Sequence, residues 1–276
     1  MNNPSNISRL KLTVVAILYN IELDQSASFK SIKGQSEHHL NVNLILWDNS
    51  PVPVKEIDKC DELNLFPFRY FHTPENLSLA KIYNRIVETE TFDYILLLDQ
   101  DTKLPENYFS LIQQAISDNL NNHLFLPIVK NRDHMVSPGQ FQFFKGIHLK
   151  TIQSGLLPSK NLLAVASGMV ISKKVFSKFK IRFDERLNLY GIDSKFMFDY
   201  ARKEKFLIVL PVVLDHHSAM WSNPTADELL PRFKNLKKAW SILLSDQPIV
   251  RSLNRMYYTV KSIIFSIKFR DIRFLK

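Results

Sequence analysis

The 276-residue sequence predicts an α/β fold in which a mostly parallel sheet is covered by helices on both faces. Two observations favour this fold. Short apolar runs alternate with segments of helical spacing along the first 130 residues, an order typical of a doubly wound parallel sheet. The runs are almost continuously apolar rather than alternating, as expected of strands that are covered on both sides.

Four apolar runs in this first part are predicted to be strands. They lie at residues 12–18, 42–47, 66–71 and 94–98, and the third is the weakest because Pro67 interrupts it. Helices are predicted between them at residues 24–36, 77–90 and 106–119. The last helix follows Pro105, a residue favoured at a helix start.

The second half of the chain is predicted to be less regular. Residues 130–161 carry several Gly and Pro residues and mixed polarity, which favours a long functional loop. A strand at 164–172, a helix at 192–203 and a strand at 206–214 are then expected. Helical spacing returns in the tail, so we expect one domain over residues 1–226 and a helical extension over 227–276.

Cysteine content and hydropathy indicate the compartment. Cys60 is the single cysteine, which excludes an internal disulfide framework and suits a reducing environment. No apolar stretch approaches the roughly 18–20 residues that a bilayer crossing needs. The apolar run at 12–18 is short and no small-residue cleavage site follows it, so we interpret it as a strand rather than a signal peptide. A cytoplasmic location is expected.

The net charge of +9 is concentrated in the tail. Residues 232–276 hold eleven Lys or Arg and two acidic residues, Asp246 and Asp271, which leaves +9. Such a tail is expected to meet an anionic partner: membrane phospholipid, a lipid-diphosphate acceptor or nucleic acid. The alternative is a tail that only confers solubility.

Two carboxylates, Asp99 and Asp101, directly follow the strand predicted at 94–98. Ligands of parallel α/β sheets bind beyond the carboxyl ends of the strands, so both side chains should lie in the ligand crevice. Like charges repel one another there, and a divalent cation would relieve the repulsion while bridging to a diphosphate. The alternative is that Asp101 only caps the turn that follows.

Three further polar sites follow predicted elements in the same manner. Asp48 follows the strand at 42–47 and could accept hydrogen bonds from a base or ribose, or simply form a turn before Pro51. Asp193 begins a predicted helix, where the helix dipole favours the ionised form that a general base needs, although an ordinary N-cap is the alternative. His216 and His217 follow the last strand and could complete a metal site or lie on the surface.

The order of these motifs resembles inverting glycosyltransferases of family 2 with the GT-A fold. The resemblance covers about residues 12–220 and rests on motifs that are each weak but follow one another at the family's spacing. In the donor half, about 10–130, these are Tyr19-Asn20, residues 48–50, residues 75–80 before a helix that carries Asn84, and Asp99-Gln100-Asp101. In the acceptor half, about 160–220, residues 167–172, 183–185, 189–193 and 214–218 resemble the rhamnosyltransferase-like branch.

The resemblance implies a role for each matching residue. Asp48 would contact the base, Asp101 with Asp99 would hold Mg²⁺ or Mn²⁺ and the diphosphate, and His216 or His217 would assist the metal. Asp193 would be the catalytic base. The other donor-binding residues would be Tyr19, Asn20, Asn76, Asn84 and Gln100. The sequence departs from the family pattern where Leu77 and Ser78 replace glycines and where Ile192 replaces an acidic residue.

The predicted function is therefore an inverting transfer from a UDP- or dTDP-sugar to a glycan or lipid-linked oligosaccharide of a bacterial surface polysaccharide. The alternatives are a non-catalytic module that binds sugar nucleotides and a sugar nucleotidylyltransferase. The latter needs a glycine-rich phosphate loop after the first strand, which residues 19–22 do not supply. A nucleic-acid partner is not expected, because acidic strand ends would repel phosphate. The basic tail predicts docking at the inner face of the membrane, with Tyr257, Tyr258, Phe265 and Phe269 inserting into the interface.

Overall fold

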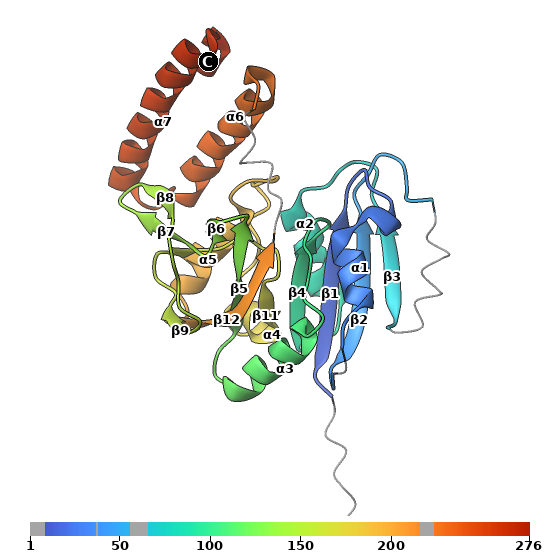
Figure 1. Cartoon of the computed structure of the whole chain (residues 1–276). Helices are drawn as coiled ribbons and strands as arrows, with labels where there is room; N and C mark the ends of the chain where they lie inside the picture. The colour runs from blue at the N-terminus through green and yellow to red at the C-terminus, as the bar shows by residue number, and fades with distance from the viewer. Residues whose placement is uncertain (1–8, 37, 56–65, 216–223) are drawn as a thin grey trace, which may run out of the picture.

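The computed structural model describes residues 9–36, 38–55, 66–215 and 224–276. Within these residues, nine strands form one sheet in the order β3-β2-β1-β4-β11-β5-β12-β9, with β6 paired to β5 (Figure 1). These strands are β1 (Lys11–Leu18), β2 (Asn41–Asp48), β3 (Phe68–His72), β4 (Tyr94–Asp99), β5 (Leu124–Asn131), β6 (His134–Ser137), β9 (Gly155–Pro158), β11 (Val170–Ser172) and β12 (Phe206–Asp215).

The predicted mostly parallel sheet is confirmed. Strands β1 to β4 are all parallel, and β1 lies between β2 and β4, so the chain winds outward to β3 and then returns to the other side of β1. Strands β5 and β12 are also parallel to each other, whereas β11 runs antiparallel between β4 and β5. The carboxyl ends of β1, β2 and β4 therefore meet at one edge of the sheet.

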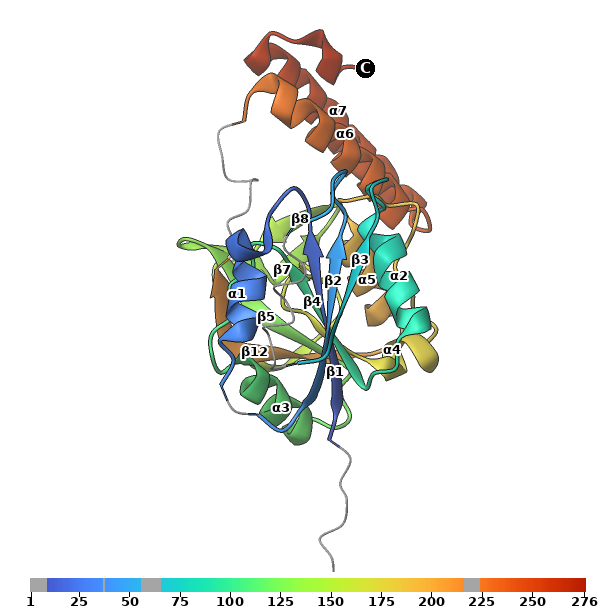
Figure 2. The same cartoon turned by 90° about the vertical axis from the view of Figure 1, so that its right-hand side faces the viewer.

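Helices cover both faces of the sheet, as Figure 2 shows. Strand residues that alternate along β1 enter different cores, because successive side chains point to opposite faces. Val15 and Ile17 pack with α2 (Leu79–Thr89), α4 (Lys173–Ser177) and α5 (Ile192–Ala201). Val14 and Ala16 pack with α1 (Ala27–Lys33) and α3 (Tyr108–Asp118). This arrangement explains why the strand sequences are apolar at nearly every position.

The region predicted as an irregular loop, residues 130–161, is instead built from short antiparallel strands. Besides β6 and β9 it contains β7 (Gly139–Gln142) and β8 (Lys145–His148), which form a second sheet with β10 (Leu162–Leu163). Most of these strands have only four residues or fewer and are buried on one face at most, so their sequences lack a continuous apolar run. The strand expected at 164–172 is likewise reduced to β11.

The helical tail is confirmed as two antiparallel helices, α6 (Ala226–Leu243) and α7 (Pro248–Phe269), which lie side by side beyond the carboxyl-terminal edge of the sheet (Figures 1 and 2). Helix α6 begins with a capping box in which Thr225 and Glu228 exchange hydrogen bonds. Helix α7 begins at Pro248, whose fixed φ suits the first turn. Asn254 of α7 donates a hydrogen bond of 2.7 Å to the Phe144 carbonyl, which ties α7 to the β7–β8 hairpin.

The tail aromatics do not face outward as the sequence suggested. Tyr258 is buried with Phe233 and Phe274, and Phe265 and Phe269 pack against the same cluster. Insertion of these aromatic rings into a membrane is therefore wrong, because they form the small core that joins α6 to α7.

Gly191 is the position at which the tail packs most closely on the body. It precedes α5 with φ +83°, a left-handed conformation that glycine adopts without steric cost. A Cβ atom at this position would lie 2.9 Å from Ala239 Cβ and 3.2 Å from Leu243 Cδ1 of α6. The start of α5 and the C-terminal part of α6 can approach only because residue 191 has no side chain.

We expect Gly191→Ala to lower the free energy of unfolding by roughly 1–3 kcal/mol, from backbone strain and overpacking together. Thermal unfolding followed by circular dichroism would measure the effect. Gly34→Ala is the matched control, because Gly34 has φ −90° and its nearest neighbours lie 3.9 Å from the added Cβ. Equal melting temperatures for the two variants would contradict the close packing of α6 on α5.

Candidate functional site

A cavity of about 1130 Å³ opens at the carboxyl ends of β1, β2 and β4. Its other walls come from the start of α5, from β8 and from the helical pair α6–α7. Six of the predicted site residues line it: Tyr19, Asn76, Asp99, Gln100, Asp101 and Asp193. The crevice that the sheet topology predicts is thus present, and it holds all three carboxylates on which the predicted chemistry depends.

Asp99 and Asp101 lie on a tight turn that immediately follows β4. The Thr102 N–H donates to the Asp99 carbonyl at 3.1 Å, which closes the turn. The Ser167 hydroxyl accepts a 3.2 Å hydrogen bond from the Asp99 N–H and also bonds to the Thr102 hydroxyl. Because Thr102 and Ser167 are almost fully buried, the turn is fixed from the side of β11.

Gln100 fixes the same turn from the side of β1. Its side-chain oxygen accepts a hydrogen bond of 2.7 Å from the Tyr19 N–H, and its carbonyl accepts from the Ser28 N–H and the Ser26 hydroxyl at 3.2 and 3.1 Å. Gln100 therefore joins the ends of β1 and β4 and the start of α1. The backbone that carries Asp99 and Asp101 is therefore fixed on both flanks.

Asn49, the residue after Asp48, organises the loop that carries Asn76. Its amide donates to the Asn76 side-chain oxygen at 2.9 Å and to the Leu77 carbonyl at 2.8 Å, and its oxygen accepts from the Leu77 N–H at 2.9 Å. Asn76 adopts φ +49°, a conformation that asparagine tolerates better than most side chains. Where Leu77 and Ser78 replace the expected glycines, the loop is therefore held by the bonds of Asn49 to Asn76 and to the Leu77 backbone.

Asp48 lies outside the cavity lining and is fully buried. Its carboxylate accepts hydrogen bonds from the Ser50 and Val54 N–H groups at 3.0 and 2.9 Å and from the Tyr70 hydroxyl at 2.6 Å. Burial would raise the pKa of Asp48, but these hydrogen bonds outweigh it and hold the pKa below its usual value. The carboxylate thus shapes the 50–54 loop, and its contact with a base stays a prediction. Asn20 also lies outside the lining, with its N–H bonded to the Ser50 hydroxyl at 2.8 Å.

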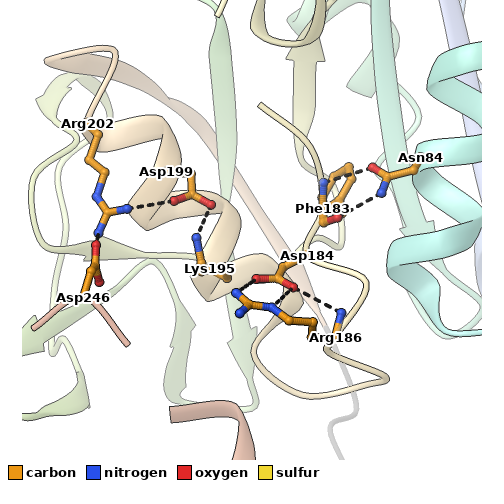
Figure 3. A network of polar contacts seen from close by, with 8 residues as sticks. All are labelled: Asn84, Phe183, Asp184, Arg186, Lys195, Asp199, Arg202 and Asp246. Atoms are coloured by element: carbon orange, nitrogen blue, oxygen red, sulfur yellow. Dashed lines mark hydrogen bonds and ion pairs between the residues drawn. The ribbon is translucent and has the colours of Figure 1, made fainter. Parts of the chain in front are cut away.

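The Asn84 side chain joins α2 to the 183–185 segment (Figure 3), and its contact with a donor stays a prediction. Its amide nitrogen donates to the Phe183 carbonyl and to Glu185 Oε1, both at 2.9 Å, while its oxygen accepts from the Phe183 N–H at 3.0 Å. The side chain is buried and does not line the cavity. Glu185 does line it, so Asn84 acts on the site by holding a neighbour.

Asp193 lies in the first turn of α5 and lines the same cavity as Asp99 and Asp101. The pKa of Asp193 is raised to about 6, mainly by burial and to a lesser degree by the charge of nearby Asp99, while hydrogen bonds from the Ser194 and Ala166 backbone oppose the rise. The Ser194 N–H donates to Asp193 Oδ1 at 2.9 Å. The group is therefore largely ionised at neutral pH yet close enough to its pKa to exchange a proton readily.

The far end of α5 is tied to the helical pair by a chain of ion pairs (Figure 3). Asp199 bonds to Lys195 and, at 3.3 Å, to Arg202, and Arg202 also bonds to Asp246 between α6 and α7. Together with the Gly191 contact, this chain connects both ends of the helix that carries Asp193 to the tail.

Sequence reasoning missed the wall opposite the carboxylates. It is basic and aromatic and comes from β8 and the tail: Lys145, His148, Arg232, Trp240 and Tyr257. Lys145 lies over the Tyr257 ring with its Nζ 5.7 Å from the centroid. The signal available in the sequence was the alternation of basic and aromatic residues in the tail, which we assigned to an outward surface.

Tyr83, interpreted from the sequence as part of an apolar stripe, also lines the cavity from α2. Its hydroxyl is buried and has no hydrogen-bond partner among the described residues. Burial, and then the charges of Asp99 and Asp193, raise the pKa of Tyr83 well above its usual value. A neutral hydroxyl therefore lies within the field of the two carboxylates.

No group of three or more His, Cys, Asp or Glu residues that could hold a metal occurs in the described parts of the chain. His216 and His217 lie outside those residues. Asp99 and Asp101 nevertheless fit a divalent cation, because Mg²⁺ is commonly bound by one or two carboxylates together with substrate phosphates. The effect of Asp99 on the pKa of Asp193 shows that negative charge accumulates here, which a cation would offset.

Comparisons with known proteins agree with this geometry. The family described as "Glycosyl transferase family 2" matches residues 13–179. An uncharacterized protein of Haemophilus influenzae is 29% identical over 89 residues, which are 31% of this chain and 47% of that protein. The match thus spans about half the length of that relative.

Solved structures show the same fold at low sequence identity. A structure of Staphylococcus aureus TarS residues 1–349 has a TM-score of 0.58 at 12% identity, covering 86% of this chain and 73% of that one. The same TarS fragment with UDP-GlcNAc gives 0.57 at 12% identity, covering 83% and 66%. GalNAc-T7 with UDP, GalNAc and Mn²⁺ gives 0.61 at 11% identity, covering 87% and 48%. The fold is therefore GT-A.

We expect Asn84→Ala to lower the free energy of unfolding by about 1–3 kcal/mol, because the Phe183 N–H and carbonyl would be left buried without partners. Thermal melting would show the loss, with Asn107→Ala as the control, since the Asn107 side chain makes no capping hydrogen bond. Calorimetric titration with UDP would show the variant's nucleotide affinity. An unchanged melting temperature with weakened UDP binding would restore Asn84 as a direct donor contact.

Proposed function

Because the chain belongs to glycosyl transferase family 2, we propose that it transfers a sugar from a UDP- or dTDP-sugar to an acceptor hydroxyl with inversion. The observation that supports this most is the convergence of Asp99, Asp101 and Asp193 on one cavity at the strand ends. Two of these carboxylates are on a rigid turn that suits a diphosphate, and the third has the pKa of a base. Residues 1–226 would form the transferase domain and residues 227–276 an extension that completes the cavity.

Asp193 is the proposed general base. It would accept the proton of the acceptor hydroxyl while that oxygen attacks the anomeric carbon and the nucleotide diphosphate leaves from the opposite face. A pKa of about 6 keeps most of the group ionised at neutral pH without making it too weak a base. The contact with Ser194 N–H fixes one carboxylate oxygen, so proton transfer is assigned to the other.

Asp99 and Asp101 are the proposed ligands of Mg²⁺ or Mn²⁺, with His216 or His217 as the proposed additional ligand. When bound, the cation would stabilise negative charge on the departing diphosphate. The chain's own contribution is the turn, whose backbone is fixed through Ser167 and Gln100 before any ligand arrives. Such preorganisation avoids the cost of ordering the ligands during binding.

The donor would lie along the ends of β1, β2 and β4, against Tyr19, Asn76 and Gln100. In this proposal Asn20, Asp48 and Asn84 affect donor binding indirectly. Their polar atoms bond to other parts of the protein and so position the residues that would contact the donor. Asp48 would fix the loop beside the nucleotide rather than bind the base directly.

The acceptor would enter beneath α6 and α7. The wall formed by Lys145, His148, Arg232 and aromatic side chains suits an anionic glycan or a lipid-linked oligosaccharide diphosphate. We propose a rhamnose or another hexose as the transferred sugar, bacterial surface polysaccharide as the product, and the inner face of the cell membrane as the place of reaction. The resemblance of residues 167–193 to the rhamnosyltransferase-like branch supports this assignment.

We expect Mn²⁺ to raise the affinity for UDP by roughly tenfold or more, and the double variant Asp99→Asn/Asp101→Asn to remove that gain. Calorimetry with and without EDTA would measure it. Asp118→Asn/Asp133→Asn removes the same charge at exposed positions and should behave as wild type. Equal affinity with and without the cation in wild type would contradict the metal site. Metal-dependent binding with no hydrolysis or transfer of a bound donor would indicate a sugar-nucleotide-binding module instead.

We expect Asp193→Asn to have opposite effects on turnover and stability. Turnover should fall by roughly 10²–10⁴-fold, and in wild type kcat/KM should rise with pH up to a plateau with a pKa near 6. Because the pKa is raised in the folded state, the ionised carboxylate costs stability as pH rises through about 6. At neutral pH the variant should therefore gain on the order of 1–3 kcal/mol in unfolding free energy. A less stable variant, or one with full turnover, would remove Asp193 from this role.

A further inference from the structure

Helix α7 has two faces with different environments. Its inner face buries Asn254, Tyr258 and Ser262, and Tyr257 and Tyr258 contribute to the cavity wall. The opposite face contacts no other part of the described chain closely enough to be buried. In Figure 1 this helix lies at the outer margin of the molecule, farther from the sheet than α6.

The outer face carries a continuous apolar stripe. We define the outward stripe as Ile249, Leu253, Met256, Val260, Ile263 and Ile267, whose side chains are between 43% and 77% exposed. Their spacing alternates between four and three residues, which places all six on one side of a helix. Ile264, 52% exposed, widens the stripe. Exposed apolar surface of this extent on a folded protein marks an interaction site.

The charges of α7 distinguish between two occupants of the outward stripe. Its 22 residues include four basic residues, Arg251, Arg255, Lys261 and Lys268, and no Asp or Glu. Helices that pair with a second copy use complementary charges beside the apolar seam. Here all four charges on α7 are positive, and one of them, Arg251, is directed to α6 by a 3.0 Å hydrogen bond to the Ser241 hydroxyl. The helix therefore offers no acidic partner to the basic residues of a second copy. A basic helix with a broad apolar face fits an anionic lipid surface.

The basic residues are placed to accompany such a contact. Lys261 lies over the Tyr257 and Phe265 rings at 5.4 and 5.6 Å, and Lys268 over the Phe269 ring at 5.1 Å. The aromatic rings thus hold both ammonium groups along the flank of the helix, where they can reach lipid headgroups while the outward stripe enters the acyl region. Within the described chain, none of the helices has the length and apolar character to cross a bilayer, so the contact is a surface one.

We propose that α7 lies in the surface of an anionic membrane with its outward stripe buried among the lipids. The purpose of this contact rests on the proposed function, because a lipid-linked acceptor would be presented at that surface. The helix that docks also forms part of the cavity wall through Tyr257 and Tyr258, so docking holds the cavity beside the headgroups.

Vesicle sedimentation of the full chain tests the proposal. Wild type should bind vesicles of equal parts phosphatidylglycerol and phosphatidylethanolamine, and bind vesicles of phosphatidylcholine at least severalfold more weakly, because each basic residue near an anionic surface adds to the attraction. The stripe variant Met256→Gln/Val260→Gln/Ile263→Gln should lower the partition coefficient by about tenfold or more, since buried apolar side chains dominate the insertion. Glutamine preserves helix propensity, so the melting temperature should stay unchanged.

The matched control replaces three exposed apolar residues elsewhere, Val52, Leu120 and Leu156, with glutamine and should bind as wild type. Failure of wild type to bind anionic vesicles, or equal binding by the stripe variant and wild type, would overturn the proposal. Sedimentation velocity would measure the oligomeric state of both proteins. A dimeric wild type and a monomeric stripe variant would overturn the proposal and assign the outward stripe to a second copy. No donor is present in these measurements, so their result does not depend on whether the chain transfers sugar.

Discussion

The gathering of Asp99, Asp101 and Asp193 in one cavity is the constraint on which the rest of the site depends. Burial raises the pKa of Asp193, and the charge of Asp99 adds to this rise. Such an arrangement persists only where the surrounding structure fixes it, because charges in a poorly solvated site otherwise separate or take up protons. The hydrogen bonds of Ser167 and Gln100 on one side, and the packing of α5 on the other, supply this rigidity.

The tail completes the site on the opposite side. Gly191 allows α6 to pack on the start of α5, Arg202 and Asp246 join the end of α5 to the α6–α7 connection, and Asn254 holds the β7–β8 hairpin. The positive charge that the sequence concentrates in this region therefore faces in two directions. Arg232 contributes to the cavity, where it lies in the same enclosed space as the carboxylates, while α7 presents its charges to the exterior.

Much of the donor half was predictable because its signals are local. The strands β1, β2 and β4 are covered on both faces and therefore apolar throughout, and polar side chains that follow them had to lie at one edge. The partners of Asp48 and Asn84 within the protein were not predictable, since a polar side chain near a crevice has the same sequence signature whatever it bonds to. Val54, Tyr70 and Phe183 are found as these partners only in the structure. The short strands of residues 134–158 escaped prediction for a different reason, because four half-exposed residues carry little periodicity.

The composition of the tail correctly predicts an amphipathic helix, but it does not show which of the apolar residues are exposed. Interleaved basic, aromatic and aliphatic side chains indicate an amphipathic helix, but not which of its apolar sides faces the protein. The aromatic side chains form the inner core because flat rings pack densely between α6 and α7, as Phe233, Tyr258 and Phe274 do. The aliphatic side chains that remain outside form the outward stripe. The exposed aliphatic face of α7 marks a place where another surface binds, and the positive charge of the helix is the reason we propose an anionic lipid surface.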